Sequence, residues 1–316
     1  MSDAQILVLG SEGAIGTRLI AMLRDFMPSA NLVRVSKSRP DIEEKIGLDN
    51  NILIGDLLDP NFVNSIFEEN HIEVIIFCAA KWNGLNNDPS VLDINVTMIN
   101  NLLLSLPGSV RNFIYLSSSA VYGDNPNDDM QNVSSLPNTT YGKSKLISET
   151  LLANKAELEN FSTIIYRPFH VVSPAEKYLP GRSHITTDFA CRYVELGYDF
   201  EWQSLRDDVY IPFYWVDDLC RVIVENMFNE QCSGKIFNIG TAKSYSILDL
   251  AKSIASVSNK YGLSSRAFPP INGKLLPVDN GFSSQLDLMF NRSPDRDLLD
   301  IIELFIIEKY RAQIRR

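Results

Sequence analysis

Short apolar runs alternate with amphipathic segments through the first half of the chain. The apolar runs predict buried strands at 5–9, 31–35, 52–54, 73–78, 113–116 and 163–166. Between them, the spacing of apolar positions predicts helices over 17–26, 61–70, 91–106 and 141–154. This alternation is typical of βαβ units, in which helices cover both faces of a parallel sheet.

The regular alternation ends after Arg167. Prolines and a glycine interrupt the next segment, at Pro174, Pro180, Gly181 and Pro212. Beyond them we expect one short strand at 237–239, a helix at 247–259 and a last helix near 294–310. The sequence therefore predicts a Rossmann-type doubly wound parallel sheet with a smaller C-terminal lobe.

Three glycines separate the first predicted strand from the first predicted helix. In the run GSEGAIG, Gly10 permits a tight turn, Gly13 lets a pyrophosphate approach the backbone, and Gly16 allows close packing of helix on strand. The N-terminus of the following helix supplies N–H donors and the positive end of a dipole. Glycines alone could simply turn the chain, but their place between strand and helix predicts dinucleotide binding.

Net charge and hydropathy narrow the possible partners. The chain carries 29 Lys and Arg against 39 Asp and Glu, a formal charge of −10, which argues against nucleic acid as a partner. No apolar run approaches the roughly 18 residues of a membrane span, and the N-terminus does not resemble a signal peptide, so we expect a cytoplasmic protein without membrane contact. The chain has four cysteines, Cys78, Cys191, Cys220 and Cys232. Their spacing is not that of metal ligands, so we expect no metal site.

Tyr141 and Lys145 are four residues apart and share one face of a predicted helix. A free tyrosine has a pKa near 10, and lowering it to about 7 requires roughly 4 kcal/mol. The ammonium of Lys145 and an oxidised nicotinamide could together supply this. The hydroxyl of Ser118, at the end of the fifth predicted strand, could polarise a carbonyl or alcohol. The pair alone is common on solvated helices, but together with the glycine turn it predicts hydride and proton transfer.

Taken in order, these motifs resemble the extended branch of the short-chain dehydrogenase/reductase superfamily, which acts on nucleotide sugars. The runs at 167–174, 216–218 and 237–240 are similar to family patterns in and around its second lobe. The resemblance implies an NAD(P)-binding domain over 1–169 plus about 213–240, and a substrate-binding lobe over about 170–212 plus 241–316. It also implies a substrate between the lobes and a homodimer formed by the helices at 91–106 and 141–154.

The resemblance assigns roles residue by residue. Ser118, Tyr141 and Lys145 become the catalytic set. Similarity to the GDP-fucose synthase subgroup adds His184 as a proton-transfer residue, although Ala120 replaces the cysteine that acts with it there. Ser119, His170 and Arg192 are candidate substrate ligands. The candidate cofactor ligands are Gly10, Gly13, Ala14, Ile15, Gly16, Ser36, Lys37, Arg39, Asp56, Leu57, Ala79, Ala80, Lys81, Asn95, Tyr141, Lys145, Pro168 and Val171.

Two departures from the family bear on the ligands. Ile211 replaces the arginine that contacts the nucleotide diphosphate, for which Arg192, Arg182 or Arg206 could substitute. The second predicted strand is followed by hydroxyls and the cations Lys37 and Arg39 rather than by an acid, which suits a 2′-phosphate. We therefore expect NADP(H) to be preferred, with NAD(H) possible, unless these cations are only a solvated basic loop.

The leading functional hypothesis is NADP(H)-dependent reduction of a keto group on a nucleotide-activated sugar. A nucleotide-sugar epimerase with tightly bound NAD is the first alternative, and a non-catalytic dinucleotide-sensing protein is the second. The segment after Ser118 lacks the acidic pair of the dehydratases, which disfavours a 4,6-dehydratase.

Overall fold

The protein is described here by a computed structural model that covers residues 4–38, 52–84, 87–123, 136–198, 200–266, 275, 278–279 and 296–314. These residues form two compact units. The first contains 4–123, 136–168 and Leu219–Asn238, and the second contains Phe169–Asp218 and the described residues from Ile239 onward. The unit boundaries fall inside a helix, α6 (Val216–Asn226), and a strand, β10 (Lys235–Ile239).

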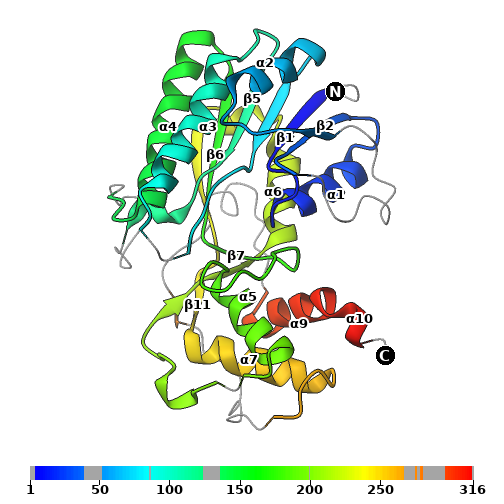
Figure 1. Ribbon diagram of the computed structural model, residues 1–316, viewed down its shortest axis with the longest axis vertical. Helices are drawn as coiled ribbons and strands as arrows, with labels where there is room; N and C mark the ends of the chain where they lie inside the picture. The colour runs from blue at the N-terminus through cyan, green and yellow to red at the C-terminus, as the bar shows by residue number, and fades with distance from the viewer. Residues whose placement is uncertain are drawn as a thin grey trace. The chain divides into compact units, whose positions relative to one another are not determined.

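A seven-stranded sheet organises the first unit, in the order β10-β6-β5-β4-β1-β2-β3 (Figure 1). The strands β1 to β6 pair in parallel with their neighbours in this order. Their bounds are β1 Gln5–Leu9, β2 Asn31–Ser36, β3 Ile52–Ile54, β4 Val74–Phe77, β5 Asn112–Leu116 and β6 Ser162–Pro168. The predicted strands are all present with small shifts at their ends, and the predicted α/β class is confirmed.

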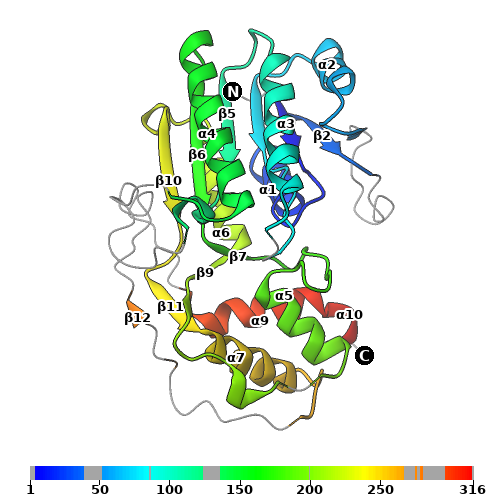
Figure 2. The ribbon, with the colours of Figure 1, turned by 60° about the vertical axis from the view of Figure 1, so that its left-hand side comes forward.

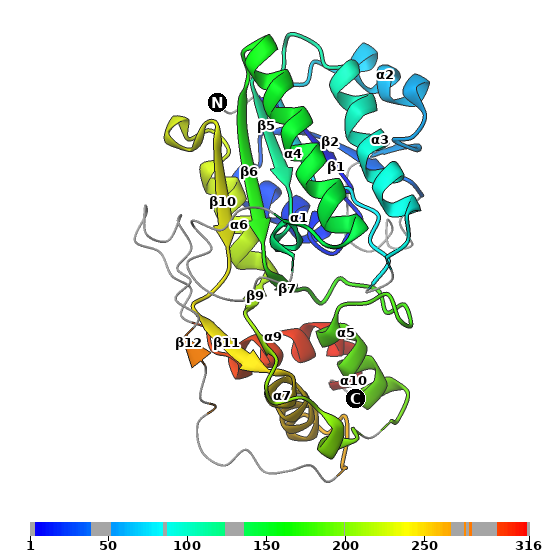
Figure 3. The same cartoon turned by 90° about the vertical axis from the view of Figure 1, so that its left-hand side faces the viewer.

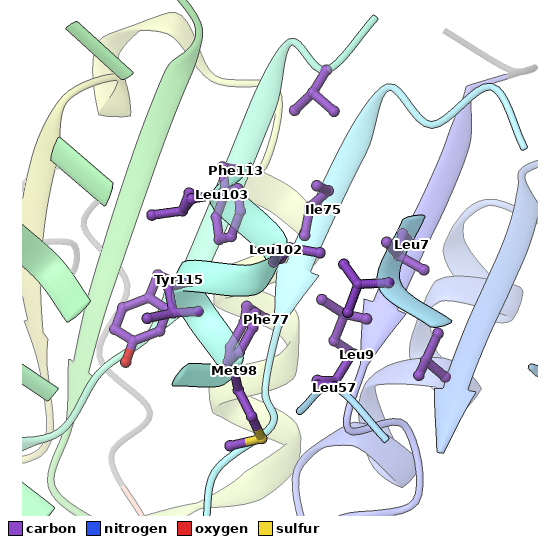
Figure 4. Close-up of a cluster of buried hydrophobic side chains, with 14 of the residues drawn as sticks. Leu7, Leu9, Leu57, Ile75, Phe77, Met98, Leu102, Leu103, Phe113 and Tyr115 are labelled. Carbon is purple, nitrogen blue, oxygen red and sulfur yellow. The ribbon is translucent and has the colours of Figure 1, made fainter. Parts of the chain in front are cut away.

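Helices cover both faces of this sheet (Figure 3). One face carries α2 (Pro60–Glu69), α3 (Ser90–Leu104) and α4 (Thr140–Glu159), while α1 (Gly16–Phe26) and α6 lie on the other. Because the inner strands are buried on both sides, they consist of almost continuous apolar residues. Figure 4 shows how side chains from α3, such as Met98 and Leu102, pack against Phe77 and Leu9 of the sheet.

The helices begin where the sequence supplies a capping side chain. Asp59 accepts a hydrogen bond from the Asn61 amide at the start of α2. Thr139 accepts one from the Gly142 amide at the start of α4. The second cap places Tyr141 in the first turn of α4, with Lys145 one turn further along.

The second unit is built from short strands and helices (Figure 2). β7 (His170–Val172) pairs in parallel with β9 (Phe213–Trp215), and β11 (Lys243–Ser246) pairs antiparallel with β8 (Tyr210–Ile211) and β12 (Val278–Asp279). The α-helices among its described residues are α5 (Ile185–Ala190), α7 (Ile247–Lys260), α9 (Leu298–Lys309) and α10 (Arg311–Ile314). Capping boxes fix the starts of α7, at Ser246 and Asp249, and of α9, at Asp297 and Asp300.

Short helical turns complete the two units. They are 3₁₀ helices at Ser119–Tyr122, Trp202–Ser204 and Glu230–Cys232, and a π-helix at Cys191–Glu195 that continues α5. Among the described residues, every helix is either too short or too polar to span a lipid bilayer.

Candidate active site

The glycine turn lies between β1 and α1, as the sequence predicts. Gly10 has a φ of +80°, and a Cβ there would lie 2.7 Å from the Ala79 amide nitrogen. A Cβ on Gly16 would lie only 2.2 Å from the Gly10 carbonyl oxygen. The conformation at Gly10 and the contact at Gly16 therefore both require glycine.

A cavity of about 420 Å³ opens at the carboxyl ends of β1, β2 and β4. Its lining includes residues of the glycine turn, of the ends of β2 and β3, and of the segment after β4. Predicted cofactor ligands form much of this lining: Gly10, Gly13, Ser36, Lys37, Asp56, Leu57, Ala79, Ala80 and Lys81. Sequence reasoning missed Glu12, Ile94 and Met98, which also line it. Apolar walls beside a few polar groups suit an adenosine.

Lys37 and Asp56 form an ion pair at the end of β2, with 2.7 Å between Nζ and Oδ2. A hydrogen bond from Lys37 holds the pKa of Asp56 below its usual range despite some burial. Lys37 is 77% exposed, so water screens this pair. Ser36 donates a hydrogen bond to the Ser38 carbonyl oxygen at 2.8 Å. Arg39, the other predicted cation, lies outside the described residues.

The predicted catalytic side chains lie together at the carboxyl end of β5. The Ser118 hydroxyl lies close enough to Tyr141 to favour its phenolate form. Lys145 Nζ lies 5.7 Å from the centroid of the Tyr141 ring and donates to the Leu116 carbonyl oxygen at 2.6 Å. Ser118 also caps the 3₁₀ helix that begins at Ser119, by accepting from the Ala120 amide. The set therefore has one hydroxyl pair with an ammonium beside it.

Burial dominates the protonation of this set. It raises the pKa of Tyr141 to about 12, although the nearby Ser118 hydroxyl opposes the shift. It lowers the pKa of Lys145 to about 8, against the opposing effects of Cys78 and Glu149. The sequence assigns the lowering of the Tyr141 pKa to the Lys145 ammonium and an oxidised nicotinamide together, and in the protein alone burial raises it. The positive charge of an oxidised nicotinamide would have to supply the rest.

Several predicted cofactor ligands do not line the cavity. Asn95 is buried, and its side-chain oxygen accepts a hydrogen bond from the Lys81 amide at 2.7 Å. Its side-chain nitrogen donates to the Lys81 carbonyl oxygen and to the Ser144 hydroxyl, each at 3.0 Å. It therefore fixes the segment after β4 against α4. Gly16 supports the turn from within, and the other predicted ligands in this unit that are absent from the lining are Ala14, Ile15, Tyr141, Lys145 and Pro168.

A buried polar network behind the catalytic helix was not predicted. Arg167 binds Glu149 through two nitrogens, at 2.9 and 2.5 Å, and donates to the Tyr122 hydroxyl at 2.8 Å. Tyr122 donates in turn to Asn238 at 2.7 Å, and Ser117 donates to Glu149. The network joins α4 to β5, β6 and β10. A charge spaced four residues after Lys145 on the same helix is the signal that could have revealed it.

In the second unit, His184 lies against Glu176, with 2.7 Å between Nδ1 and Oε1. The ring of His170 stands edge-on to His184, 5.5 Å between centroids, and its Nε2 lies 3.2 Å from the Thr186 hydroxyl. Burial and the charge of His184 lower the pKa of His170 to about 3. The structure thus brings these predicted histidines together, and Glu176 was missed. Val171 lies between His170 and Val172 in β7.

Arg192 lines a separate cavity of about 370 Å³ in the second unit. Phe189, Tyr198 and Phe200 form aromatic walls around it, and Glu201 contributes a carboxylate. The Arg192 guanidinium pairs with Asp188 at 3.1 Å, and its side chain is 53% exposed. Aromatic rings beside a cation form a lining suited to a planar base attached to phosphate groups.

The family model of NAD dependent epimerases and dehydratases matches residues 6–240. This is more than half of the chain. The chain belongs to the NAD dependent epimerase/dehydratase family. It is therefore an NAD(P)-dependent enzyme of the extended short-chain dehydrogenase/reductase type, as the resemblance implies. Membership in this epimerase/dehydratase family fits the glycine turn and the adenosine-sized cavity beside it.

Several relatives of this chain are nucleotide-sugar enzymes. UDP-glucose 4-epimerase of Haemophilus influenzae is 28% identical over 287 residues, covering 80% of this chain and 82% of that protein. The dTDP-D-glucose 4,6-dehydratase of Bos taurus is 26% identical over 268 residues, covering 79% and 72%. A solved UDP-glucose 4-epimerase of Thermotoga maritima with UDP-glucose has a TM-score of 0.76 at 20% identity, covering 98% and 99%. That of Thermus thermophilus with NAD has a TM-score of 0.77 at 19% identity, covering 97% and 99%, and both share the fold.

Proposed function

We propose that this enzyme is a nucleotide-sugar epimerase that uses a tightly bound dinucleotide as its cofactor. The observation that carries the proposal is the grouping of Ser118, Tyr141 and Lys145 at the carboxyl end of β5, with Lys145 Nζ 5.7 Å from the centroid of the Tyr141 ring. The full-length relatives named as UDP-glucose 4-epimerases support inversion at C4 of a UDP-hexose over reduction. A dinucleotide sensor would not need this proton-transfer set.

The cavity in the first unit fits the adenosine part of the dinucleotide. The backbone of Gly10 and Gly13 and the start of α1 would hold the pyrophosphate. Leu57 and Met98 would enclose the adenine, and Lys145 would hold the nicotinamide ribose. When bound, the oxidised nicotinamide supplies an acceptor that takes a hydride from the sugar and can return it.

Tyr141 carries the proton chemistry. In its phenolate form it takes the proton of the sugar hydroxyl as the hydride leaves the same carbon, which gives a keto sugar. The Ser118 hydroxyl donates to the developing carbonyl oxygen. Tyr141 would then give the proton back to the oxygen of the keto sugar, and a hydride returned to the opposite face of the carbon would invert it with no net oxidation.

The aromatic cavity in the second unit is the proposed nucleotide site. A pyrimidine ring would stack on Phe189 or Phe200, and Arg192 would pair with the diphosphate in place of the family arginine that Ile211 replaces. Glu201 in the same lining would disfavour phosphate close to it, so we expect the diphosphate to lie on the Arg192 side.

NADP(H)-dependent reduction of a keto sugar is the second candidate, because Lys37 lines the adenosine cavity. In that case the Glu176–His184 pair of the second unit would serve any proton transfer beside the ketone. We also propose a homodimer through α3 and α4. Exposed Leu104 (74%), Leu158 (82%) and Ile147 (41%) on these helices support an apolar contact.

A panel of nucleotide sugars tests the proposal. The purified enzyme is incubated with UDP-, dTDP-, GDP- and CDP-hexoses without added coenzyme, and the products are analysed by ¹H NMR. We expect one nucleotide class to yield a mixture of C4 epimers. Conversion only with added NADPH, in proportion to the NADPH consumed, would overturn the epimerase assignment and favour the reductase.

A further inference from the structure

The glycine turn carries an acidic side chain that is fixed from behind. Glu12 lies between Gly10 and Gly13, and its Oε1 accepts a hydrogen bond from Nη2 of Arg34 at 2.7 Å. Arg34 lies in the middle of β2, where it is only 2% exposed. The Ser11 hydroxyl, 3.3 Å away, also donates to Oε1.

Stability does not explain this pair. Two nitrogens of the Arg34 guanidinium, Nε and Nη1, are buried and have no hydrogen-bond partner among the residues that the structure describes. Burying an incompletely paired charge is unfavourable, and an apolar residue is the usual choice inside a parallel strand. What the pair does achieve is a carboxylate held in one orientation.

Glu12 faces the corner of the adenosine cavity at the end of β2. The Gly10 and Ser11 amides both donate to the Val35 carbonyl oxygen, at 3.2 and 3.3 Å, which ties the turn to the end of that strand. Glu12 lines the cavity together with Ser36 and Lys37. In Rossmann domains an acid after the second strand receives the adenosine ribose hydroxyls at this corner. Here the turn, rather than the strand end, provides a carboxylate.

We propose that Glu12, held by Arg34, accepts hydrogen bonds from the adenosine ribose and excludes a 2′-phosphate, so that the enzyme selects NAD(H) over NADP(H). The inference rests on the dinucleotide site of the proposed function. It reverses the preference for NADP(H) that the sequence predicts from Lys37 and Arg39.

The charges around the cavity support this reversal. Lys37 is largely exposed and paired with Asp56, so its attraction for a phosphate is both screened and shared. Glu12, by contrast, would place a like charge beside the phosphate. Arg34 cannot act as the phosphate ligand in this arrangement, because its guanidinium is buried and its one bonded nitrogen is directed at Glu12.

Titration calorimetry of the full chain, freed of bound nucleotide, tests the proposal with NAD⁺ and NADP⁺. We expect the wild type to bind NAD⁺ at least about tenfold more tightly, which corresponds to about 1.4 kcal/mol. Glu12→Gln keeps the shape and an acceptor for Arg34 but removes the charge, and should reduce the ratio about tenfold, mainly by strengthening NADP⁺ binding. Glu68→Gln, the same charge change at an exposed position of α2, should leave the ratio unchanged.

The outcomes separate this inference from the proposed function. Equal or tighter binding of NADP⁺ by the wild type, or an unchanged ratio in Glu12→Gln, would overturn the role of Glu12. Failure of the wild type to bind either dinucleotide would instead overturn the proposed function itself. If thermal unfolding shows that Glu12→Gln is not folded, the double variant Glu12→Gln/Arg34→Leu removes both charges of the pair and carries the same expectation. The ratio of NAD⁺ to NADP⁺ affinity in the wild type tests the proposal even if neither variant folds.

Discussion

Arg167 and Glu149 form a two-pronged ion pair inside the first unit, with Nε–Oε1 at 2.9 Å and Nη2–Oε2 at 2.5 Å. Arg167 directly precedes Pro168 at the end of β6, and Glu149 follows Lys145 by one turn of α4. The pair therefore fixes the helix that carries Tyr141 and Lys145 against the strands beneath it. We infer that it positions the catalytic side chains without contacting substrate.

Breaking this pair should destabilise the enzyme strongly. Arg167→Met leaves Glu149 buried without its counter-charge, which costs about 3–5 kcal/mol in unfolding free energy. Denaturation by urea, followed by circular dichroism, measures the loss. Arg206→Met is the matched control, because water screens the exposed pair of Arg206 with Asp208 and its loss should leave the unfolding free energy nearly unchanged. Similar losses in the two variants would contradict the positioning role.

Removing the Tyr141 hydroxyl should abolish most turnover. Tyr141→Phe keeps the ring beside Lys145 but removes the proton donor and acceptor, so we expect kcat to fall by about 10²- to 10⁴-fold. Dinucleotide affinity, measured by thermal shift, should change little. The control is Tyr210→Phe, at an exposed position of β8. Near-normal turnover of Tyr141→Phe would remove this residue from the mechanism.

The close contact at Gly16 predicts a sharp difference between two glycines. An added methyl at Gly16 would meet the Gly10 carbonyl oxygen at 2.2 Å, whereas nothing lies within 4 Å of one at Gly108. Gly16→Ala should therefore cost about 1–3 kcal/mol of stability and weaken dinucleotide binding. Gly108→Ala should be nearly neutral in both measurements. Equal behaviour of the two variants in thermal shift would show that the turn does not require glycine.

The lowered pKa of His170 predicts that the unfolding free energy falls as the pH is lowered. Its pKa in the folded protein is about 3, mainly because of burial and then because of His184, while in the unfolded chain it is near 6.5. Below pH 6.5 the unfolded chain therefore binds a proton that the folded protein does not. The contribution of His170 is complete above pH 6.5 and is lost as the pH falls toward 3.

Comparing two histidine variants isolates this effect. Between pH 7 and pH 4.5, the wild type should lose about 2 kcal/mol more unfolding free energy than His170→Asn. His71→Asn, at an exposed position, should follow the wild type. A wild type that loses no more than His170→Asn on acidification would show that His170 is not held in its neutral form.

The first unit was predictable from sequence because the apolar positions of most of its strands and helices recur with the spacing of a buried strand or an amphipathic helix. Even the strand at 52–54 was found, since three apolar residues lie between polar ones. The helix α6 was not predicted although Leu219, Cys220 and Ile223 follow helical spacing, because its start coincides with the acidic run that matches a family pattern. Strands of the second unit such as β7 and β8 are too short for periodicity to reveal, and only pairing with distant segments makes them strands.

The site was predictable for residues whose place at the end of a strand or the start of a helix already brings them to the same edge of the sheet. Tyr141, Lys145 and Ser118 come together because the ends of parallel strands and the start of the next helix share one edge of the sheet. The partner of Arg34 was not predictable in this way. A charge inside an apolar strand signals a buried pair, but Glu12 lies on a different element, and only the fold brings the two side chains together.

Isotope labelling at C4 tests the central claim most directly. The enzyme is given a UDP-hexose that carries deuterium at C4, in ordinary water and without added coenzyme, and the products are followed by NMR and mass spectrometry. Because the proposed mechanism removes the hydride and returns the same one, the C4-inverted product should keep its deuterium fully. Loss of deuterium to water during inversion, or a product reduced at the expense of added NADPH, would contradict the account.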